Sequence, residues 1–210
     1  MSVRFLVFFL LVFSIPKSFA GLMFEPYLGI GSGTYSSTTK PGGFSLDSPM
    51  DSKISGAMLG ARLGYKILGF WTAIDYTGVA WDLKYDKPAS TPNGKAAGQF
   101  IFADVGFDFP FLLRAYGGYG FSNTLKVVGN NSLGIPGEEV LSGGSAIKAG
   151  VGFTFLPFVS INIEYIKPTF SKYALSASGV SLTDGSADSN FSALDLSVTM
   201  LSVSFPINLF

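Results

Sequence analysis

The sequence predicts an all-β protein: an eight-stranded antiparallel up-and-down transmembrane β-barrel, preceded by a signal peptide. The composition is apolar yet poor in helix formers, with 48% hydrophobic residues, 13% charged residues, 26 glycines and 11 prolines. Apolar residues recur at every second position, which is the period of a β-strand. Short and long connections alternate along the chain, as they do in barrels that cross a membrane.

The first twenty residues are expected to be a cleaved signal peptide. A basic residue, Arg4, precedes the apolar run Phe5–Phe13, and the small residues Ser18 and Ala20 precede the expected cut. The run is too short for an anchor helix, since a membrane span takes about 20 apolar residues. We therefore expect cleavage after Ala20 and a single barrel domain over residues 21–210, with no further domain after it.

The stretch KAGVGFTFLPFVSINIEY (Lys148–Tyr165) has no charge between Lys148 and Glu164, so a membrane helix has to be considered. Its apolar residues, however, occupy alternate positions on both sides of a break at Pro157. A helix would mix the apolar and polar positions on every face. We therefore expect two strands and a tight turn. Lys148 and Glu164 should both point into the barrel and approach each other across this hairpin.

The same pattern predicts two more hairpins, Gly60–Tyr76 and Phe102–Gly120, and single strands within Phe24–Gly33 and Phe191–Phe210. These make eight strands, each long enough for a span of about 9–11 tilted residues. Short turns would then lie at one end of the barrel and long loops at the other. The predicted long loops, rich in Ser, Thr, Gly, Pro and Asn, are Tyr35–Lys53, Lys84–Ala97, Asn123–Gly143 and Pro168–Asn190.

Nearly every charge within the predicted strands lies on the face opposite the apolar residues. An eight-stranded barrel is only wide enough for side chains to fill its interior, and charges buried there need partners. We therefore expect a structural plug; the alternative, a proton or ion path, is disfavoured by the barrel width. The predicted lumen charges are Glu25, Arg62, Asp75, Asp104, Asp108, Arg114, Lys148 and Glu164. The glycines predicted to make room for them are Gly29, Gly31, Gly60, Gly64, Gly118, Gly150 and Gly152.

Aromatic residues cluster near the predicted short turns. They fit a girdle at the membrane interface; a soluble aromatic core is the alternative, and their outward parity argues against it. The residues are Tyr65, Phe70, Phe107, Phe109, Phe111, Phe155, Phe158 and Phe205.

The whole chain after the signal peptide resembles the small eight-stranded outer-membrane barrels, the OmpA transmembrane-domain and opacity-protein-like group. The features that carry the resemblance are the signal peptide, EPYLGIGSGTY in the first strand, the repeated GxGF and GY hairpins, and a C-terminal Phe210. The resemblance implies a location in the cell outer membrane of a Gram-negative cell, among lipid and lipopolysaccharide. It also implies insertion by the barrel-assembly machinery, which reads a last strand ending in Phe210.

The last strand departs from the pattern of that group. The resemblance implies apolar residues two and four positions before Phe210, where this chain has Asn208 and Pro206. The alternation of apolar residues also changes parity near Met200, so we expect a β-bulge there.

Catalysis and cofactor binding are not expected. The chain has no His and no Cys, so Ser–His and Asp–His mechanisms are excluded. Asp184 and Asp188 lie in LTDGSADSN, but their spacing does not match a calcium loop. GIGSG (Gly29–Gly33) lies inside a strand with no helix after it, so it is not a nucleotide fingerprint. The formal net charge of zero gives no reason to expect a nucleic acid partner, and we expect a monomer.

Two classes of function remain. The first is a structural or surface-interaction barrel with a plugged lumen, whose four long loops contact an external ligand. The alternative is a narrow channel for small hydrophobic molecules, similar to the OmpW-like barrels, which would need an apolar upper lumen that opens sideways. The residues predicted to line such a pocket in the half nearer the long loops are Trp71, Val79, Trp81, Phe100 and Phe102.

Overall fold

The computed structural model describes most of the predicted barrel domain. The described residues are 20–39, 50–85, 94–110, 112–130, 136–156, 158–177, 180–186 and 191–209. Within these ranges, no helix is long and apolar enough to cross a membrane. The strands of these ranges belong to one twelve-stranded sheet.

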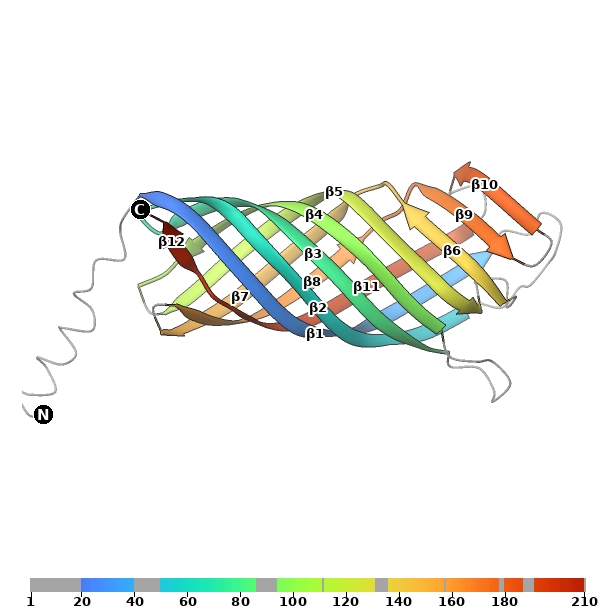
Figure 1. Cartoon of the computed structure of the whole chain (residues 1–210), viewed down its shortest axis with the longest axis horizontal. Helices are drawn as coiled ribbons and strands as arrows, with labels where there is room; N and C mark the ends of the chain where they lie inside the picture. Colours follow the sequence, from blue (N-terminus) through green and yellow to red (C-terminus); the bar gives the residue numbers. More distant parts are fainter. Residues whose placement is uncertain are drawn as a thin grey trace, which may run out of the picture.

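Eight of the strands form a closed antiparallel barrel (Figure 1). The sheet closes because β5 pairs with β7 as well as with β4, so the predicted eight-stranded antiparallel barrel is confirmed. Closure leaves the wall without an edge from the short turns up to the Ile166–Val198 pair, as a membrane-spanning sheet requires. The barrel strands are β1 (Gly21–Thr39), β2 (Met50–Ile67), β3 (Phe70–Tyr85), β4 (Gly94–Asp108), β5 (Leu113–Asn130), β7 (Ala146–Leu156), β8 (Val159–Pro168) and β11 (Phe191–Ser204).

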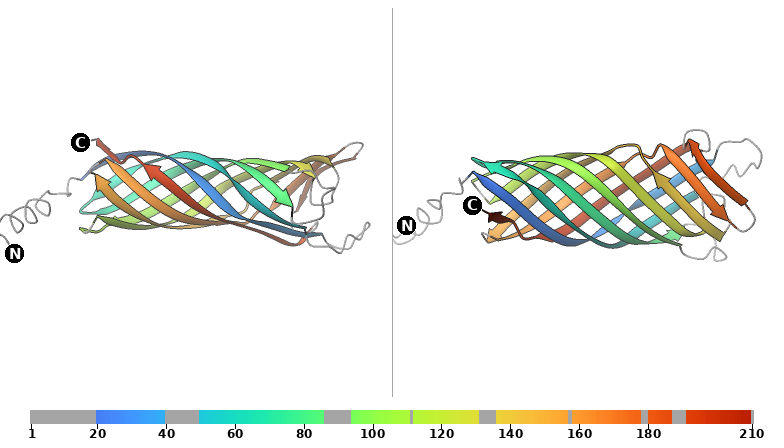
Figure 2. Two further views of the ribbon diagram at one scale, coloured as in Figure 1. Left: turned by 90° about the horizontal axis from the view of Figure 1, so that it is seen from below. Right: turned by 45° about the horizontal axis from the view of Figure 1, so that its top comes forward.

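Short turns and long connections separate to the two ends, as predicted (Figures 1 and 2). The β2–β3, β4–β5 and β7–β8 turns share one end with the start of β1 and with β12 (Ile207–Leu209), which pairs with β1. We call this the short-turn end and the opposite one the long-loop end. The β2–β3 turn is tight because Leu68 and Gly69 both adopt positive φ angles, 50° and 89°.

Three further strands stand at the long-loop end and form what we call the long-loop arm: β6 (Pro136–Ser142), β9 (Lys172–Ala177) and β10 (Val180–Ser186). At the long-loop end, β5 pairs with β6, β6 pairs with β9, and β9 pairs with β10. The sequence-based assignment of Asn123–Gly143 and Pro168–Asn190 as loops is therefore wrong over most of their length. Ser, Gly and Asn are typical of turns, but here the same residue types also occur in strands that extend beyond the barrel.

The strands are staggered around the barrel. Following paired residues from Gly31 once around the wall leads back to β1 at Gly21, ten residues away. The path runs through Gly31, Met200, Glu164, Gly150, Tyr116, Gly106, Trp71, Lys66 and Gly21. In an eight-stranded barrel, such a tilted wall encloses a space that side chains fill.

The polarity of the two faces inverts between the short-turn half and the long-loop half. On β2, the inward Arg62 is fully buried, while the outward Leu59 and Leu63 are 64% and 54% exposed. Farther along the same strand, the inward Ile54 is buried and the outward Lys53 is exposed. The short-turn half is therefore polar inside and apolar outside, as in a membrane, and the long-loop half is the reverse, as in water.

This inversion corrects the expected bulge near Met200. The pairing of β11 with β1 and β8 continues through Met200 without a shift. Leu196 and Met200 point inward to the apolar interior of the long-loop half, and Leu201 and Phe205 point outward from the short-turn half. The apolar pattern changes parity because its surroundings invert, while the strand itself keeps its alternation.

Irregularities of the wall lie elsewhere. Between β4 and β5 the register shifts, since Phe102 pairs with Gly120 and Ile101 with Ser122, which leaves Phe121 as a bulge. Between β8 and β11 the ladder ends at Ile166–Val198, and above it β9 pairs with β6 and β10 instead.

Candidate functional site in the barrel lumen

Arg62 is the centre of a buried ion-pair network in the short-turn half. Its Nε donates to Asp75 Oδ2 at 2.9 Å, Nη1 donates to Glu25 Oε1 at 2.9 Å, and Nη2 donates to Glu164 Oε1 at 2.9 Å. All four side chains are completely buried. One guanidinium thus joins its cross-strand neighbours on β1 and β3 to a carboxylate of β8 across the lumen, using the fork geometry that suits arginine.

Two tyrosine rings hold the guanidinium from both sides. Arg62 Cζ lies 4.7 Å from the centroid of Tyr27 and 4.7 Å from that of Tyr116, within the range of cation–π attraction. Each ring lies over a glycine, because a Cβ at Gly60 would overlap Tyr27 and one at Gly150 would overlap Tyr116. The predicted role of inner glycines as space for large side chains is therefore confirmed at these positions.

Lys148 forms the second cationic centre. Its Nζ donates to Asp75 Oδ2 at 2.5 Å and lies 2.6 Å from Asp104 Oδ2. The predicted approach of Lys148 to Glu164 does not form, although both point inward. In the hairpin, Lys148 is paired with Ile166 and Glu164 with Gly150. Lys148 instead meets Asp104 over Gly118 of β5, with which both are paired, and Glu164 reaches Arg62 of β2.

A third group of charges lies closest to the short turns. Arg114 Nη1 donates to Glu25 Oε1 at 2.7 Å, and Arg114 Nε donates to Asp108 Oδ1 at 3.2 Å. Asp108 also accepts hydrogen bonds from Lys66 Nζ and, at 3.1 Å, from Trp71 Nε1. All eight predicted lumen charges therefore join one network. Lys66, which the sequence analysis missed, has the same strand parity as Arg62 and could have been found from it.

Small polar side chains complete the network on β8 and β11. Asn162 Nδ2 donates to Ser204 Oγ at 2.9 Å, and Ser202 Oγ donates to Glu164 Oε1 at 3.1 Å. These residues are buried. They were not predicted because serine and asparagine occur equally in loops and on exposed strand faces.

The lumen of the long-loop half contains one cluster of buried apolar side chains. The predicted inward positions of Val79, Trp81, Phe100 and Phe102 are confirmed, at 6%, 4%, 1% and 0% exposure. The prediction for Trp71 is half wrong. It points inward, but it lies at the short-turn end against Tyr116, because it is the second residue of β3 and follows the β2–β3 turn directly.

A hydrogen bond spans the top of this cluster. Tyr35 Oη of β1 donates to Glu139 Oε1 of β6 at 3.1 Å, and both side chains are buried. The lumen thus has a charged short-turn half, an apolar long-loop half and a polar contact above it.

Aromatic side chains mark both edges of the outward apolar band. Of the predicted girdle, Tyr65, Phe70, Phe109, Phe158 and Phe205 are exposed on the outer surface. Phe107 stacks on Phe70, while Phe111 and Phe155 lie outside the described side chains. A second set at the other edge was not predicted: Tyr76, Tyr119, Phe121 and Tyr165. Aromatic rings at two levels are the pattern of a barrel that spans a bilayer.

Several other predictions concern residues that the structure does not describe. These are the signal peptide up to residue 19, the side chains of Asp184 and Asp188, and Phe210. In the parts of the chain that are described, no group of three or more acidic, His or Cys residues could hold a metal ion.

No protein-family model and no curated protein matches the chain, but 47 chains of solved structures do. OprG, an outer membrane protein from Pseudomonas aeruginosa, matches with a TM-score of 0.57 and 14% identity, covering 91% of this chain and 99% of that one. This chain has the fold of the small outer-membrane β-barrels. The outer membrane protein AlkL matches this barrel with a TM-score of 0.53 and 11% identity, covering 90% of this chain and 91% of AlkL.

Looser similarity extends to other barrels. Ail, the attachment invasion locus protein of Yersinia pestis, was solved in complex with the heparin analogue sucrose octasulfate. It matches with a TM-score of 0.45 and 15% identity, covering 87% of this barrel and 99% of Ail.

Proposed function

We propose that this barrel is an integral outer-membrane protein with a structural or surface-interaction role, no enzymatic activity and a lumen that does not conduct. The observation that carries the proposal is the Arg62 network. One buried guanidinium is bonded to three carboxylates from three strands, so the narrow interior is filled by charges that satisfy each other. A lumen filled in this way holds neither a water path nor a substrate. The outer surface and the long-loop end are then the parts that can carry a function.

The long-loop end is the part that we assign to external contacts. The wall of the barrel continues beyond its outward apolar band, and there the outward residues Lys53, Asp82, Lys84 and Lys95 are exposed. Polar outer residues over an apolar interior are expected of a wall that stands in water. This end, with the long-loop arm, would reach past the lipid and lipopolysaccharide towards a ligand or a neighbouring cell.

Export and insertion follow from the same proposal. The chain would be cut after Ala20, and β1 begins at the next residue, Gly21. The barrel-assembly machinery would read the final strand, which the structure divides into β11 and β12 at Phe205 and Pro206. The inserted protein would be a monomer, because the barrel is closed without a second copy.

A channel for small hydrophobic molecules is less well supported. The interior of the long-loop half is apolar, as such a channel would need. However, the inward side chains there form one contiguous cluster of buried residues, with Phe100 1% and Phe102 0% exposed, as expected of a packed core.

Fractionation and heat-modifiable gel migration test the membrane assignment. The protein should appear in the outer-membrane fraction, start at Gly21 by N-terminal sequencing, and migrate faster before boiling than after it. A soluble periplasmic protein with a single migration would refute the proposal.

Planar-bilayer recordings then test the plug. The purified barrel should show no stepwise conductance, and a strain without the gene should keep its permeability to small hydrophobic compounds. Measurable conductance of the unmodified barrel, or slower uptake in the deletion strain, would favour the channel instead.

A further inference from the structure

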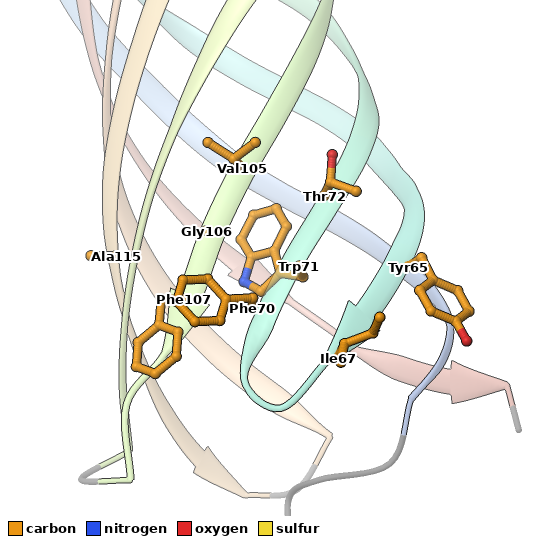
Figure 3. Close-up of a pocket in the computed structure, with 9 residues that line it drawn as sticks. All are labelled: Tyr65, Ile67, Phe70, Trp71, Thr72, Val105, Gly106, Phe107 and Ala115. Carbon is orange, nitrogen blue, oxygen red and sulfur yellow. The ribbon is translucent and has the colours of Figure 1, made fainter.

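A groove lies on the outer surface near the short turns, on the other side of the wall from the lumen network (Figure 3). Its volume is about 490 Å³. It spans the ends of β2, β3, β4 and β5 nearest the β2–β3 turn. The lining residues are Tyr65, Ile67, Phe70, Trp71, Thr72, Val105, Gly106, Phe107 and Ala115.

Differences in side-chain size create the groove. Ala115 has a small outward side chain, and Gly106 has none; a Cβ at Gly106 would point inward and overlap the Trp71 indole. Phe70 and Phe107 stand beside them with ring centroids 4.5 Å apart. The Phe107 ring stands directly opposite the small Ala115 on the next strand, which leaves a furrow in this part of the wall.

The level of the groove along the barrel indicates which part of the membrane surrounds it. Outward residues at the same level are apolar and strongly exposed, including Phe70 at 67%, Val105 at 64% and Leu113 at 50%. This is the band that meets hydrocarbon in an inserted barrel. Since short turns are periplasmic in such barrels, the groove faces the inner leaflet of the outer membrane.

We propose that the groove binds one acyl chain of an inner-leaflet phospholipid. The proposal rests on the insertion proposed above. Binding a chain there covers apolar protein surface with a flexible apolar partner that fits a furrow, and it requires no hydrogen bonds from the site.

The chemistry of the lining favours a chain over a headgroup or a peptide. The Thr72 hydroxyl already donates to the Asp104 carbonyl oxygen at 3.1 Å. Lys66, which follows Tyr65 in β2, is turned into the lumen and bonded to Asp108. The lining therefore presents no cation to a phosphate. Its other hydroxyl belongs to Tyr65, which is 47% exposed, so binding should depend on the chain and not on a charged headgroup.

The two tryptophans of the chain allow a direct test. Trp71 belongs to the lining, with its indole on the inner side of the wall at that point, whereas Trp81 lies in the apolar interior of the long-loop half. The Trp81→Phe barrel, with Trp71 alone, is reconstituted into vesicles that mix a phospholipid with its chain-brominated form. Bromine on the chain should quench Trp71 strongly, and at least twofold more than it quenches Trp81 in the matching Trp71→Phe barrel.

A filling variant and a matched control separate a bound chain from ordinary surrounding lipid. Ala115→Phe, made in the Trp81→Phe background, fills the groove and should reduce the quenching of Trp71 at least twofold. Ala149→Phe makes the same change at an outward position of β7, outside the lining, and should leave the quenching unchanged. Phosphatidylethanolamine and phosphatidylglycerol with the same brominated chain should quench equally.

Three outcomes would overturn the proposal. Equal quenching in the Ala115→Phe and Ala149→Phe barrels would mean that no chain occupies the groove. Quenching that depends on the headgroup would mean that a headgroup is recognised. Cross-linked dimers of the unfilled barrel, lost in Ala115→Phe, would mean that a second copy covers the groove. Heat-modifiable migration of each variant confirms insertion, so failure of the insertion proposal is recognised separately.

Discussion

In the short-turn half of this barrel the charges are inside and the apolar residues are outside, whereas in the long-loop half the arrangement is reversed. The same strands run through both halves, and their side chains keep alternating inward and outward. Glu25 and Tyr35 show this on β1, since both point inward, one into the ion-pair network and the other into the apolar cluster. The apolar pattern of a strand therefore reports its surroundings, and a change in that pattern need not be a change in geometry.

The two halves also draw stability from different sources. Burying an apolar residue from water is favourable, and the long-loop half gains in this way. In the short-turn half the outer surface meets lipid, so little is gained by moving apolar groups inward, and specific polar contacts hold the interior. Each prediction below tests one side of this difference.

Replacing Arg62 should have the largest effect. In Arg62→Met, the carboxylates of Glu25, Asp75 and Glu164 lose their shared cation while they remain buried, which costs about 3–5 kcal/mol for a broken buried pair. The free energy of unfolding is measured by urea titration in vesicles, with gel mobility as the readout. The control is Lys126→Met, which removes an exposed pair with Glu138 (2.7 Å) and should cost less than about 1 kcal/mol. Equal stability of the two variants would show that the network does not stabilise the barrel.

Truncating Phe100 should destabilise the other half by about 3 kcal/mol. Phe100 is 1% exposed within the apolar cluster, so Phe100→Ala opens a cavity in a packed core. The comparison variant is Leu28→Ala, at a lipid-facing position that is 60% exposed, where lipid chains fill the space. The same titration should give a clearly smaller loss for Leu28→Ala, and equal losses would contradict the assignment of the long-loop half as a packed core.

Gly60→Ala tests the packing around the guanidinium. The new methyl group overlaps the Tyr27 ring, and overpacking of this kind costs about 1–3 kcal/mol. Gly78→Ala is the matched control, because its Cβ would point outward and meet Leu59 O at 3.7 Å, an ordinary contact. Unfolding in urea should distinguish the two, and a barrel that tolerates both changes equally would show that the inner glycines are not space for Tyr27.

Lys167→Ala should have the smallest effect. Lys167 Nζ lies 3.3 Å from Asp195 Oδ1, close to where the β8–β11 ladder ends, and both side chains are about half exposed. An exposed pair contributes less than about 1 kcal/mol and is weakened by salt. Urea titrations at low and high salt should show that the loss disappears at high salt. A loss of stability that persists at high salt would mean that the pair lies in lipid. The boundary between the short-turn half and the long-loop half would then have to be moved.

The sequence predicted which residues point inward far better than which residues meet. Strand parity alone located all eight lumen charges, because the period of a strand is exactly two. The partners of Lys148 could not be found in this way, since Asp75 and Asp104 belong to the other two hairpins. Asp104 is level with Lys148 because both pair with Gly118 of β5, and parity within one hairpin contains no information about that register.

The change of polarity was detected but misinterpreted. The change in the parity of the apolar positions near Met200 was visible in the sequence. It was interpreted as a bulge, which is what such a change requires if one environment surrounds the whole strand. The actual bulge, at Phe121, was missed, because the glycines before it, Gly117, Gly118 and Gly120, left few side chains whose parity could reveal the shift. The long-loop arm was missed for a similar reason, since polar strands in water resemble loops in composition.

The breaks above the apolar band have a consequence for how such a protein can diversify. Gly143 and Gly144, with φ angles of 68° and 74°, separate β6 from β7, and β8 ends at Pro168 before β9 begins. Insertions or exchanges in β6, β9 and β10 therefore need not preserve the stagger that closes the membrane part. The long-loop arm can therefore be exchanged without altering the membrane-spanning part of the barrel. Grafting a foreign hairpin in its place should leave that part able to insert into the membrane.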